Sequence, residues 1–314
     1  MMVGSDFLRT NTRRLREIVN ILAYFLAVVL LGALMAPPLY WAAQSLAGSG
    51  LFGRLATFEF QKFFNRAMLI AAVALLWPAI RFVRIRQWRE LGLQRDPRAA
   101  RHVAIGAAIA ILGVAAMAMA YVAFDIYRWK QELPWEKIPG LLLSAIVVGL
   151  LEEALFRGAI FGLFRRALPP FTAMFFVTLI FASVHFLKPD NNVQIGPVTW
   201  SSGLALVPHL FHQFTEGMTL LAEFTTIFVL GWVLGYATLR TRSLWMAIGL
   251  HAGVVFTKMT FSKFTKRHTE LLPWVGDELQ IGLVPVGVLA LCGLCVWWYV
   301  RHLDVDPRTD PIHH

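Results

Sequence analysis

The sequence predicts an all-α protein, a polytopic transmembrane helical bundle of about eight spans. Three observations lead to this prediction: 57% of the 314 residues are hydrophobic, 15% are charged, and long apolar runs recur along the chain. A soluble domain carries about 25% charged residues. An apolar helix of about 20 residues is long enough to cross the hydrocarbon core of a bilayer. The composition therefore excludes an ordinary soluble globular protein.

The formal net charge of +10 does not indicate a nucleic-acid partner, because the arginines lie between the apolar runs. Basic residues in short loops set the orientation of a membrane protein, since these loops stay in the cytoplasm. Such residues precede the first run, in segment 9–16, and follow the second run, in segment 81–101. We therefore expect an integral protein of the bacterial cytoplasmic membrane, surrounded by membrane lipids, with both termini in the cytoplasm.

The expected spans follow the apolar runs in order. The first, Ile18 to Ala36, is longer than the apolar part of a signal peptide and is followed by two prolines, so we interpret it as a retained span. The piece 203–214 is too short to cross and is expected at the interface or as a re-entrant element. The other spans are expected at about 67–83, 103–124, 138–164, 170–187, 219–239, 244–257 and 281–300.

The spans divide the chain into three parts. Residues 1–137 hold three spans and a basic cytoplasmic linker, and residues 259–314 hold the last span and a cytoplasmic tail. Residues 138–258 form a core that carries the polar residues discussed below. One loop opposes the predicted orientation, because its basic residues would lie outside the cell. They are Lys258, Lys263, Lys266 and Arg267.

The fourth span contains two adjacent carboxylates and an arginine: Glu152, Glu153 and Arg157. An ionised side chain at the bilayer centre costs several kcal/mol, so three together predict a functional site. On a helix, Glu153 and Arg157 face each other across one turn, which predicts an ion pair. Glu152 projects about 100° away and is left to act as a general base for water. A packing role for the pair, with Glu152 as a bystander, is the alternative.

Two histidines lie inside later spans, His185 in the fifth and His251 in the seventh. A lone histidine in an apolar helix is commonly a hydrogen-bonded packing residue. Together with Glu152 from a third span, the two histidines form a set of a kind that can bind a divalent metal. The same set can also activate water and polarise a carbonyl. Zinc on Glu152, His185 and His251 and a metal-free glutamate mechanism are therefore both open.

These motifs, in this order, resemble those of the CPBP family of intramembrane proteases. The family includes the type II CAAX prenyl endopeptidases and the lysostaphin-resistance-protein-A-like (Abi) proteins. The resemblance covers roughly residues 141–257 and implies an endopeptidase, of metalloprotease or glutamate type, that acts on a peptide or membrane-protein substrate. The motifs are Glu152-Glu153-x-x-x-Arg157, Phe181-x-x-x-His185 and His251.

The resemblance also implies a role for each position. Glu152 is implied as the catalytic carboxylate and His185 as its partner in activating water. Glu153 and Arg157 are implied as a supporting pair. His251 is implied as an oxyanion stabiliser, or as a metal ligand in a metalloprotease.

The chain departs from the family at one position. The third motif usually continues His-x-x-x-Asn or Asp, and here the fourth residue after His251 is Val255. Valine donates no hydrogen bond, and the loss of one oxyanion donor costs about 10²–10³ in rate. The alternative function is therefore a non-catalytic scaffold or immunity protein that keeps the fold. A proton-coupled transporter is a third hypothesis. It is disfavoured because no inverted repeat is visible in the sequence.

Two further motifs have plainer readings. His209, His212 and Glu216 would share one helix face, as in a metal site, but we expect the wet face of an interfacial helix. Cys292 and Cys295 form a CxxC inside the last apolar run. We expect them to be small packing residues, because a redox or metal pair needs a polar, accessible setting.

Overall fold

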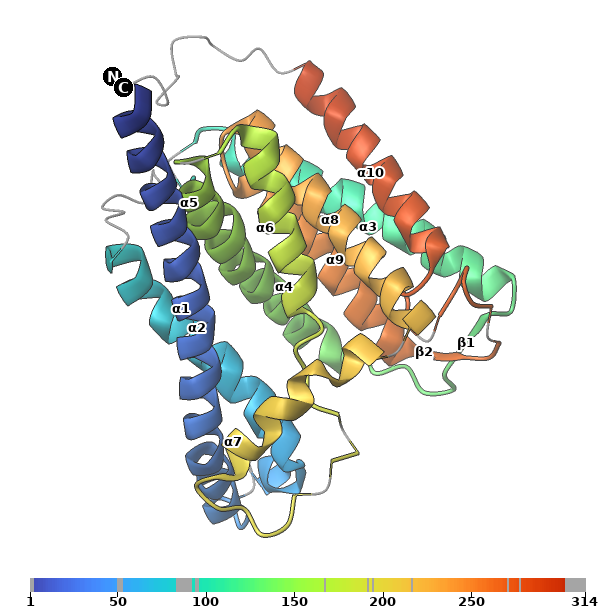
Figure 1. Ribbon diagram of the computed structural model, residues 1–314. Helices are drawn as coiled ribbons and strands as arrows, with labels where there is room; N and C mark the ends of the chain where they lie inside the picture. The colour runs from blue at the N-terminus through green and yellow to red at the C-terminus, as the bar shows by residue number, and fades with distance from the viewer. Residues whose placement is uncertain are drawn as a thin grey trace. The chain divides into compact units, whose positions relative to one another are not determined.

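The protein is described by a computed structural model that covers residues 3–49, 53–82, 92–93, 96–166, 168–190, 192–193, 195–215, 217–269, 271–276 and 278–302. Helices dominate it, which confirms the all-α prediction (Figure 1). Within these ranges, six helical stretches are long and apolar enough to cross a membrane, so the chain is an integral membrane protein. They are Val19–Ser45, Phe60–Ala79, Ala99–Ala123, Trp135–Arg165, Gly217–Thr241 and Leu283–Arg301.

The remaining two expected spans are also helices, but each falls short of one criterion for a span. Helix α6 (Pro170–Val184) is apolar and has 15 residues. Helix α9 (Trp245–Phe264) has 20 residues, and its polar side chains, His251 and Lys258 among them, lower its mean hydropathy. The helices of the expected eight-span bundle are therefore all present, with six of them qualifying as spans by length and composition.

The chain folds as two compact units, and both are built from separated segments. Unit 1 comprises Met1–Gln94 and Leu151–Phe228, and unit 2 comprises Arg95–Leu150 and Val229–His314. The borders fall inside two helices, α4 (Ile138–Glu153) and α8 (Gly217–Thr241). The three-part division at residues 137 and 258 stays a prediction.

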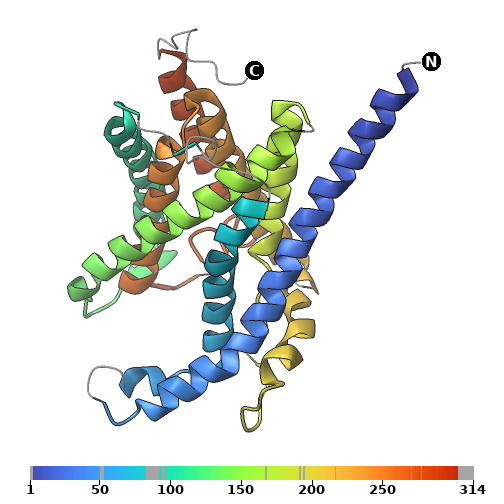
Figure 2. The ribbon, with the colours of Figure 1, turned by 90° about the vertical axis from the view of Figure 1, so that its left-hand side faces the viewer.

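Unit 1 begins with α1 (Val3–Ser45) and α2 (Phe60–Phe82), which are joined through the 3-10 turn Gly53–Thr57. The two helices lie side by side in both views (Figures 1 and 2). The Tyr24 hydroxyl donates to the Ala72 carbonyl at 2.7 Å. This bond satisfies a polar group that would be costly to leave unpaired in an apolar setting.

The short apolar piece forms α7 (Ser202–Leu206) and the 3-10 helix η5 (Val207–Thr215). Leu206 and Leu210 are buried against α1 and α2, in a cluster with Ala33 and Phe64. Gly203 lies so close to the Ala33 carbonyl that a β-carbon would not fit there. The piece is thus a short element packed on two spans, too short to cross, as predicted.

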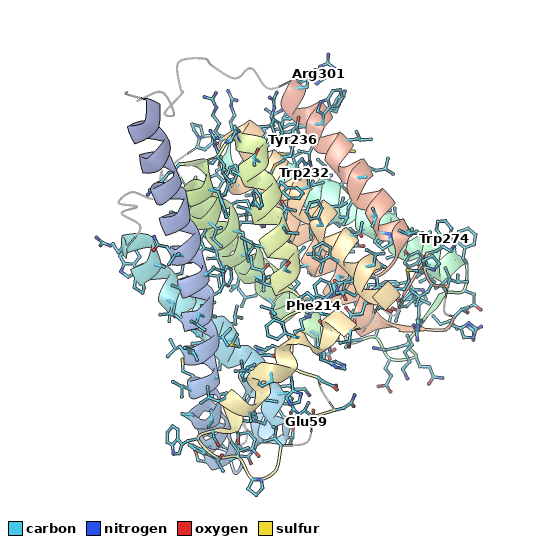
Figure 3. All side chains as sticks on the ribbon, in the orientation of Figure 1. Glu59, Phe214, Trp232, Tyr236, Trp274 and Arg301 are labelled. Carbon is cyan, nitrogen blue, oxygen red and sulfur yellow. The ribbon has the colours of Figure 1, made fainter. Side chains whose placement is uncertain are left out.

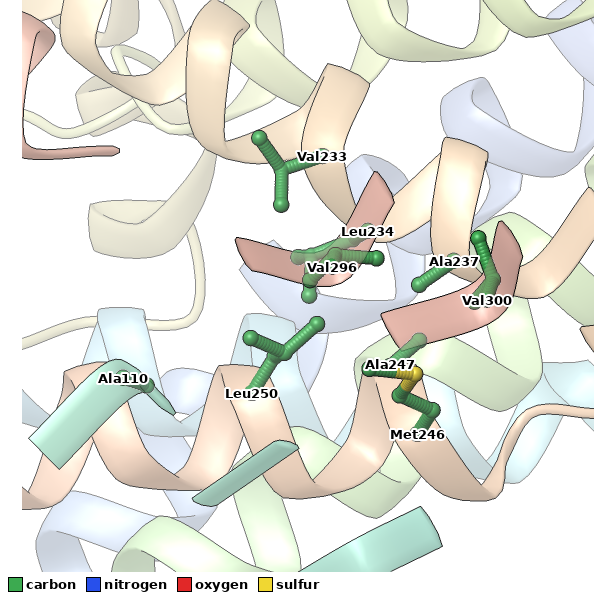
Figure 4. Packing of buried hydrophobic residues seen from close by; sticks show 9 residues of the cluster. All are labelled: Ala110, Val233, Leu234, Ala237, Met246, Ala247, Leu250, Val296 and Val300. Atoms are coloured by element: carbon green, nitrogen blue, oxygen red, sulfur yellow. The ribbon is translucent and has the colours of Figure 1, made fainter. Parts of the chain in front are cut away.

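Unit 2 is centred on α3 (Ala99–Ala123) and α9, with α10 (Leu283–Arg301) packed on α3. Glycines allow α3 and α9 to approach closely: a β-carbon on Gly106 would meet the Met246 carbonyl, and one on Gly249 would meet the Val103 carbonyl. Small residues serve this purpose in membrane helices. Leu234, Leu250 and Val296 belong to the core between α8, α9 and α10 (Figure 4).

A two-stranded sheet lies at one end of unit 2, in loops where the residue pattern predicted no strand. Strand β1 (Tyr127–Trp129) follows α3 and pairs antiparallel with β2 (Thr265–Arg267), which follows α9. Three-residue strands in polar loops carry too short a pattern to be recognised. Because the strands are hydrogen-bonded, the loops after α3 and α9 lie on the same side of the membrane.

Candidate active site

The Glu-Glu-Arg run lies where the fourth expected span changes its helical geometry. Helix α4 ends at Glu153, and the next seven residues, Ala154–Ile160, form a π-helix, η4, before α5 (Phe161–Arg165). The sequence predicted an ordinary α-helix here, and this expectation was wrong for η4. A π-turn inserts one extra residue per turn and often marks a functional site, because it re-aims side chains.

Glu153 and Arg157 form the predicted ion pair. Arg157 Nη1 donates to Glu153 Oε1 at 2.8 Å. The Arg157 side chain is 2% exposed and the Glu153 side chain is 0% exposed. The Arg157 guanidinium also lies 4.2 Å from the centroid of the Phe181 ring, a cation–π contact. A charge this deeply buried persists only with a partner, so each member of the pair stabilises the other.

Glu152 and His185 form a second pair, whose side chains are partly exposed although the Glu152 Oε2 atom itself is buried. Glu152 Oε2 lies 3.7 Å from His185 Nε2. The Glu152 side chain is 25% exposed and the His185 side chain is 29% exposed. This distance is beyond direct hydrogen bonding and suits a bridging water. The site therefore provides two polar groups that one water molecule can contact at the same time.

The hydrogen bond on the other ring nitrogen fixes the orientation of His185. His185 Nδ1 lies 2.7 Å from the Phe181 carbonyl oxygen, one turn earlier at the end of α6. A carbonyl oxygen only accepts, so Nδ1 carries the hydrogen. In the neutral imidazole, Nε2 then presents its lone pair on the side of Glu152.

Phe181 connects the two pairs. Its fully buried ring contacts the Arg157 guanidinium, the His185 ring at 4.6 Å and the Phe156 ring at 5.1 Å between centroids. The sequence marked Phe181 as a motif position and assigned it no role. Its spacing of four residues before His185, on the same helix face, is the signal that points to this contact.

His251 lies in unit 2, near the middle of α9, and is 2% exposed. On the same helix, Ile248 and Ala252 pack against Gly149 of α4, where a β-carbon would be 3.1 Å from the Ala252 nitrogen. Val255, one turn after His251, is partly buried. The grouping of His251 with Glu152 and His185 stays a prediction, since those two residues belong to unit 1.

The metal assignment also stays a prediction. A catalytic zinc site takes three protein ligands. Unit 1 brings two of the candidates together, Glu152 and His185. No group of three or more His, Cys, Asp or Glu side chains placed to hold a metal occurs in the part of the chain that the structure describes. The described donor set does not by itself fit zinc, and we derive no catalytic step through a metal.

The two secondary motifs, His209/His212/Glu216 and Cys292/Cys295, lie apart from these pairs in the sequence. His209 is exposed, and His212 Nε2 lies 3.6 Å from Asp190 Oδ2, while Glu216 falls outside the described residues. In α10, Cys292 is buried against the Ile109 carbonyl and Cys295 is exposed.

Comparison with known families supports the predicted resemblance. Residues 134–257 match the family model described as type II CAAX prenyl endopeptidase Rce1-like. The matched segment contains Glu152, Glu153, Arg157, His185 and His251, and the match confirms the predicted resemblance over this segment. No curated protein matches the chain significantly. At a coarse level, the chain is a membrane protein similar to a family of peptidases.

Proposed function

We propose that this membrane protein, whose central segment is similar to type II CAAX prenyl endopeptidases, is an intramembrane endopeptidase that uses Glu152 to activate water. The observation that carries the proposal is the pair Glu152–His185, 3.7 Å apart and partly exposed beside a fully buried ion pair. Carboxylate and imidazole are the side chains most often used for general acid–base catalysis.

In the proposed reaction, a water molecule donates one hydrogen bond to Glu152 and another to His185 Nε2. Glu152 takes a proton as the water oxygen attacks the carbonyl carbon of the scissile peptide bond. The resulting tetrahedral oxyanion collapses as the C–N bond breaks, and the proton on Glu152 passes to the leaving amine. His185 orients the water because the Phe181 carbonyl holds its Nδ1–H. Such orientation lowers the entropic barrier.

Glu153 and Arg157 act as positioning residues in this proposal. Their side chains are 0% and 2% exposed, so neither touches a substrate. The pair carries no net charge and fixes the helix turn from which Glu152 projects. Arg157 also fixes the Phe181 ring, which packs against His185.

His251 is proposed to stabilise the oxyanion, as the family resemblance implies. Val255 stands where the family has a second polar residue, and this favours a second candidate function, a non-catalytic membrane scaffold. The two functions differ in one clear respect. A scaffold keeps its cellular role when Glu152→Gln and His185→Ala remove the acid–base groups.

The substrate is proposed to be a peptide bond at or in the membrane, in a membrane protein or peptide. The test compares membrane-derived peptide fragments from cells that express the wild-type protein, Glu152→Ala or the control Glu136→Ala. The Glu136 side chain is exposed in the short 3-10 helix Trp135–Lys137. We expect fragments that are present in wild type and control and absent in Glu152→Ala. Identical fragments in all three strains would contradict the proposal.

The metal question has its own experiment. Purified protein is analysed for bound zinc, and cleavage of a peptide containing the identified site is measured with and without a chelator. Activity that persists without stoichiometric metal supports the glutamate mechanism. Loss of activity on chelation, with recovery on adding zinc, would contradict the metal-free version.

A further inference from the structure

The sheet end of unit 2 has a composition that the proposed protease chemistry does not use. We define it as residues 124–137, 258–269 and 271–275, which follow α3 and include β1, β2 and the end of α9. Because α3 ends at Ala123 and α4 begins at Ile138, the segment between them starts and finishes where membrane helices emerge. Such positions lie at the level of lipid headgroups.

Three lysines are exposed at this end: Lys137, Lys263 and Lys266. None of their amines has an ion-pair partner among the residues that the structure describes. The nearby Lys130 amine donates to the carbonyl oxygens of Ser262 and Lys263 at the end of α9. Burial, and then the charges of these three lysines, lower the pKa of Lys130.

The sheet register adds to this concentration of positive charge. Arg128 on β1 is directly opposite Lys266 on β2. Like charges directly opposite each other destabilise a sheet. Asp125 neutralises Arg128 through two hydrogen bonds of 2.6 Å. Lys263 lies in the last turn of α9, and the side chains of Lys263 and Lys266 are exposed.

Large aromatic side chains surround the lysines. Trp129 is 47% exposed, Trp135 is 63% exposed and Trp274 is 59% exposed. The Trp135 ring packs on Phe264 at 5.0 Å, beside Lys263 in the sequence, and Trp274 lies near the sheet (Figure 3). Tryptophan is enriched at membrane interfaces because its ring is apolar and its N–H is polar.

We propose that the sheet end of unit 2 binds the phosphate-bearing headgroups of anionic phospholipids. The three lysine amines supply positive charge for the phosphate, and the exposed tryptophans lie between headgroups and acyl chains. Basic residues near an anionic membrane surface attract its lipids through this electrostatic term. The occupant is an intact lipid, since an isolated phosphate ion makes no use of the aromatic side chains.

The test uses the full-length protein purified in a neutral detergent. Its affinity for phosphatidylglycerol, phosphatidylcholine and inorganic phosphate is measured by native mass spectrometry and by the shift of the unfolding midpoint. We expect tighter binding of phosphatidylglycerol than of phosphatidylcholine, and no midpoint shift with inorganic phosphate. A lysine at an anionic surface contributes about fivefold in affinity, so Lys263→Gln/Lys266→Gln should weaken phosphatidylglycerol binding about thirtyfold.

The matched control is Lys62→Gln/Lys188→Gln, which removes two exposed lysines of unit 1. It should bind phosphatidylglycerol like the wild type. Each variant's unfolding midpoint without added lipid shows whether its fold is intact. Equal affinity for the two lipids, an equal loss in the control, or an equal shift with inorganic phosphate would each overturn the proposal.

Discussion

Two ionisable pairs lie next to each other in unit 1 and differ in their access to water. Glu153 and Arg157 are hydrogen-bonded at 2.8 Å and fully buried. Glu152 and His185 are 3.7 Å apart, and about a quarter of each side chain is exposed. The backbone of Glu152 adjoins that of Glu153, so a single residue step separates a closed pair from an open one.

This difference shows how one membrane helix supports both structure and chemistry. A closed pair satisfies its own charges and has no capacity left for a substrate. The Glu152–His185 pair is not in direct hydrogen-bond contact, and its 3.7 Å separation suits a bridging water. We therefore expect substitutions in the closed pair to change stability and substitutions in the open pair to change activity.

The largest expected effect is on activity. His185→Ala should lower kcat/KM for an identified peptide by about 10²–10⁴, the usual contribution of a general acid–base group. Its unfolding midpoint should stay near that of the wild type, because the side chain is partly exposed. Adding Glu152→Gln should cost little more, since residues that act as a unit are non-additive. Fully additive losses would show that the two residues act separately.

The next effect is on stability. Arg157→Met leaves the Glu153 carboxylate buried without its cation, which should lower the free energy of unfolding by about 3–5 kcal/mol. Chemical unfolding in detergent measures this loss. Glu153→Gln/Arg157→Met should recover most of it, because the uncompensated charge is gone. If the double variant is no more stable than Arg157→Met, the pair does not act through its charges.

A smaller effect is expected at the residue that joins the pairs. Phe181→Leu keeps the backbone carbonyl that accepts from His185 but removes the ring from Arg157 and His185. Loss of the desolvated cation–π contact should cost about 2 kcal/mol of stability. We also expect kcat to fall with KM little changed, because the His185 imidazole loses the ring that packs against it. Phe156→Leu is the comparison, since the centroid of that ring is 6.0 Å from the guanidinium, farther than the Phe181 ring.

The smallest effect concerns an exposed ion pair. Arg128 holds the pKa of Asp125 below its ordinary value by hydrogen bonding, with His268 also nearby. The stabilisation of the folded state by this ion pair is thus present above about pH 3.9, the pKa of an unperturbed aspartate. It is lost as the pH falls through the lowered pKa of Asp125. Arg128→Met should therefore leave the unfolding midpoint nearly unchanged at pH 7 and remove this part of its acid dependence. A loss as large as that of Arg157→Met would contradict the contrast between exposed and buried pairs.

Local spacing explains which parts of the site could be predicted from the sequence. Glu153 and Arg157 are four residues apart, and helical geometry brings such side chains together. The π-helix was missed because an apolar helical run with one internal glycine, Gly158, does not distinguish π from α geometry. The pairing of β1 with β2 was missed because it joins segments that are distant in the sequence.

The long-range part of the site was predicted from chemistry and supported by family resemblance. Periodicity placed Glu152 and His185 on separate helices. The rarity of ionisable side chains in apolar spans suggested that they act together, and the motif order of the family agreed with this. The role of Phe181 was not predicted, because it depends on the contacts of the Phe181 ring with both Arg157 and His185. The burial of Glu153 beside Arg157 and the partial exposure of Glu152 agree with the distinction that helical spacing predicted.

The most direct test of the account is the cleavage rate of purified Glu152→Gln on a peptide that the wild type cleaves. The substitution keeps the shape of the side chain and removes its basicity. We predict a rate reduced by about 10²–10⁴ with an unchanged unfolding midpoint. Cleavage at the wild-type rate would contradict the assignment of Glu152 as the general base.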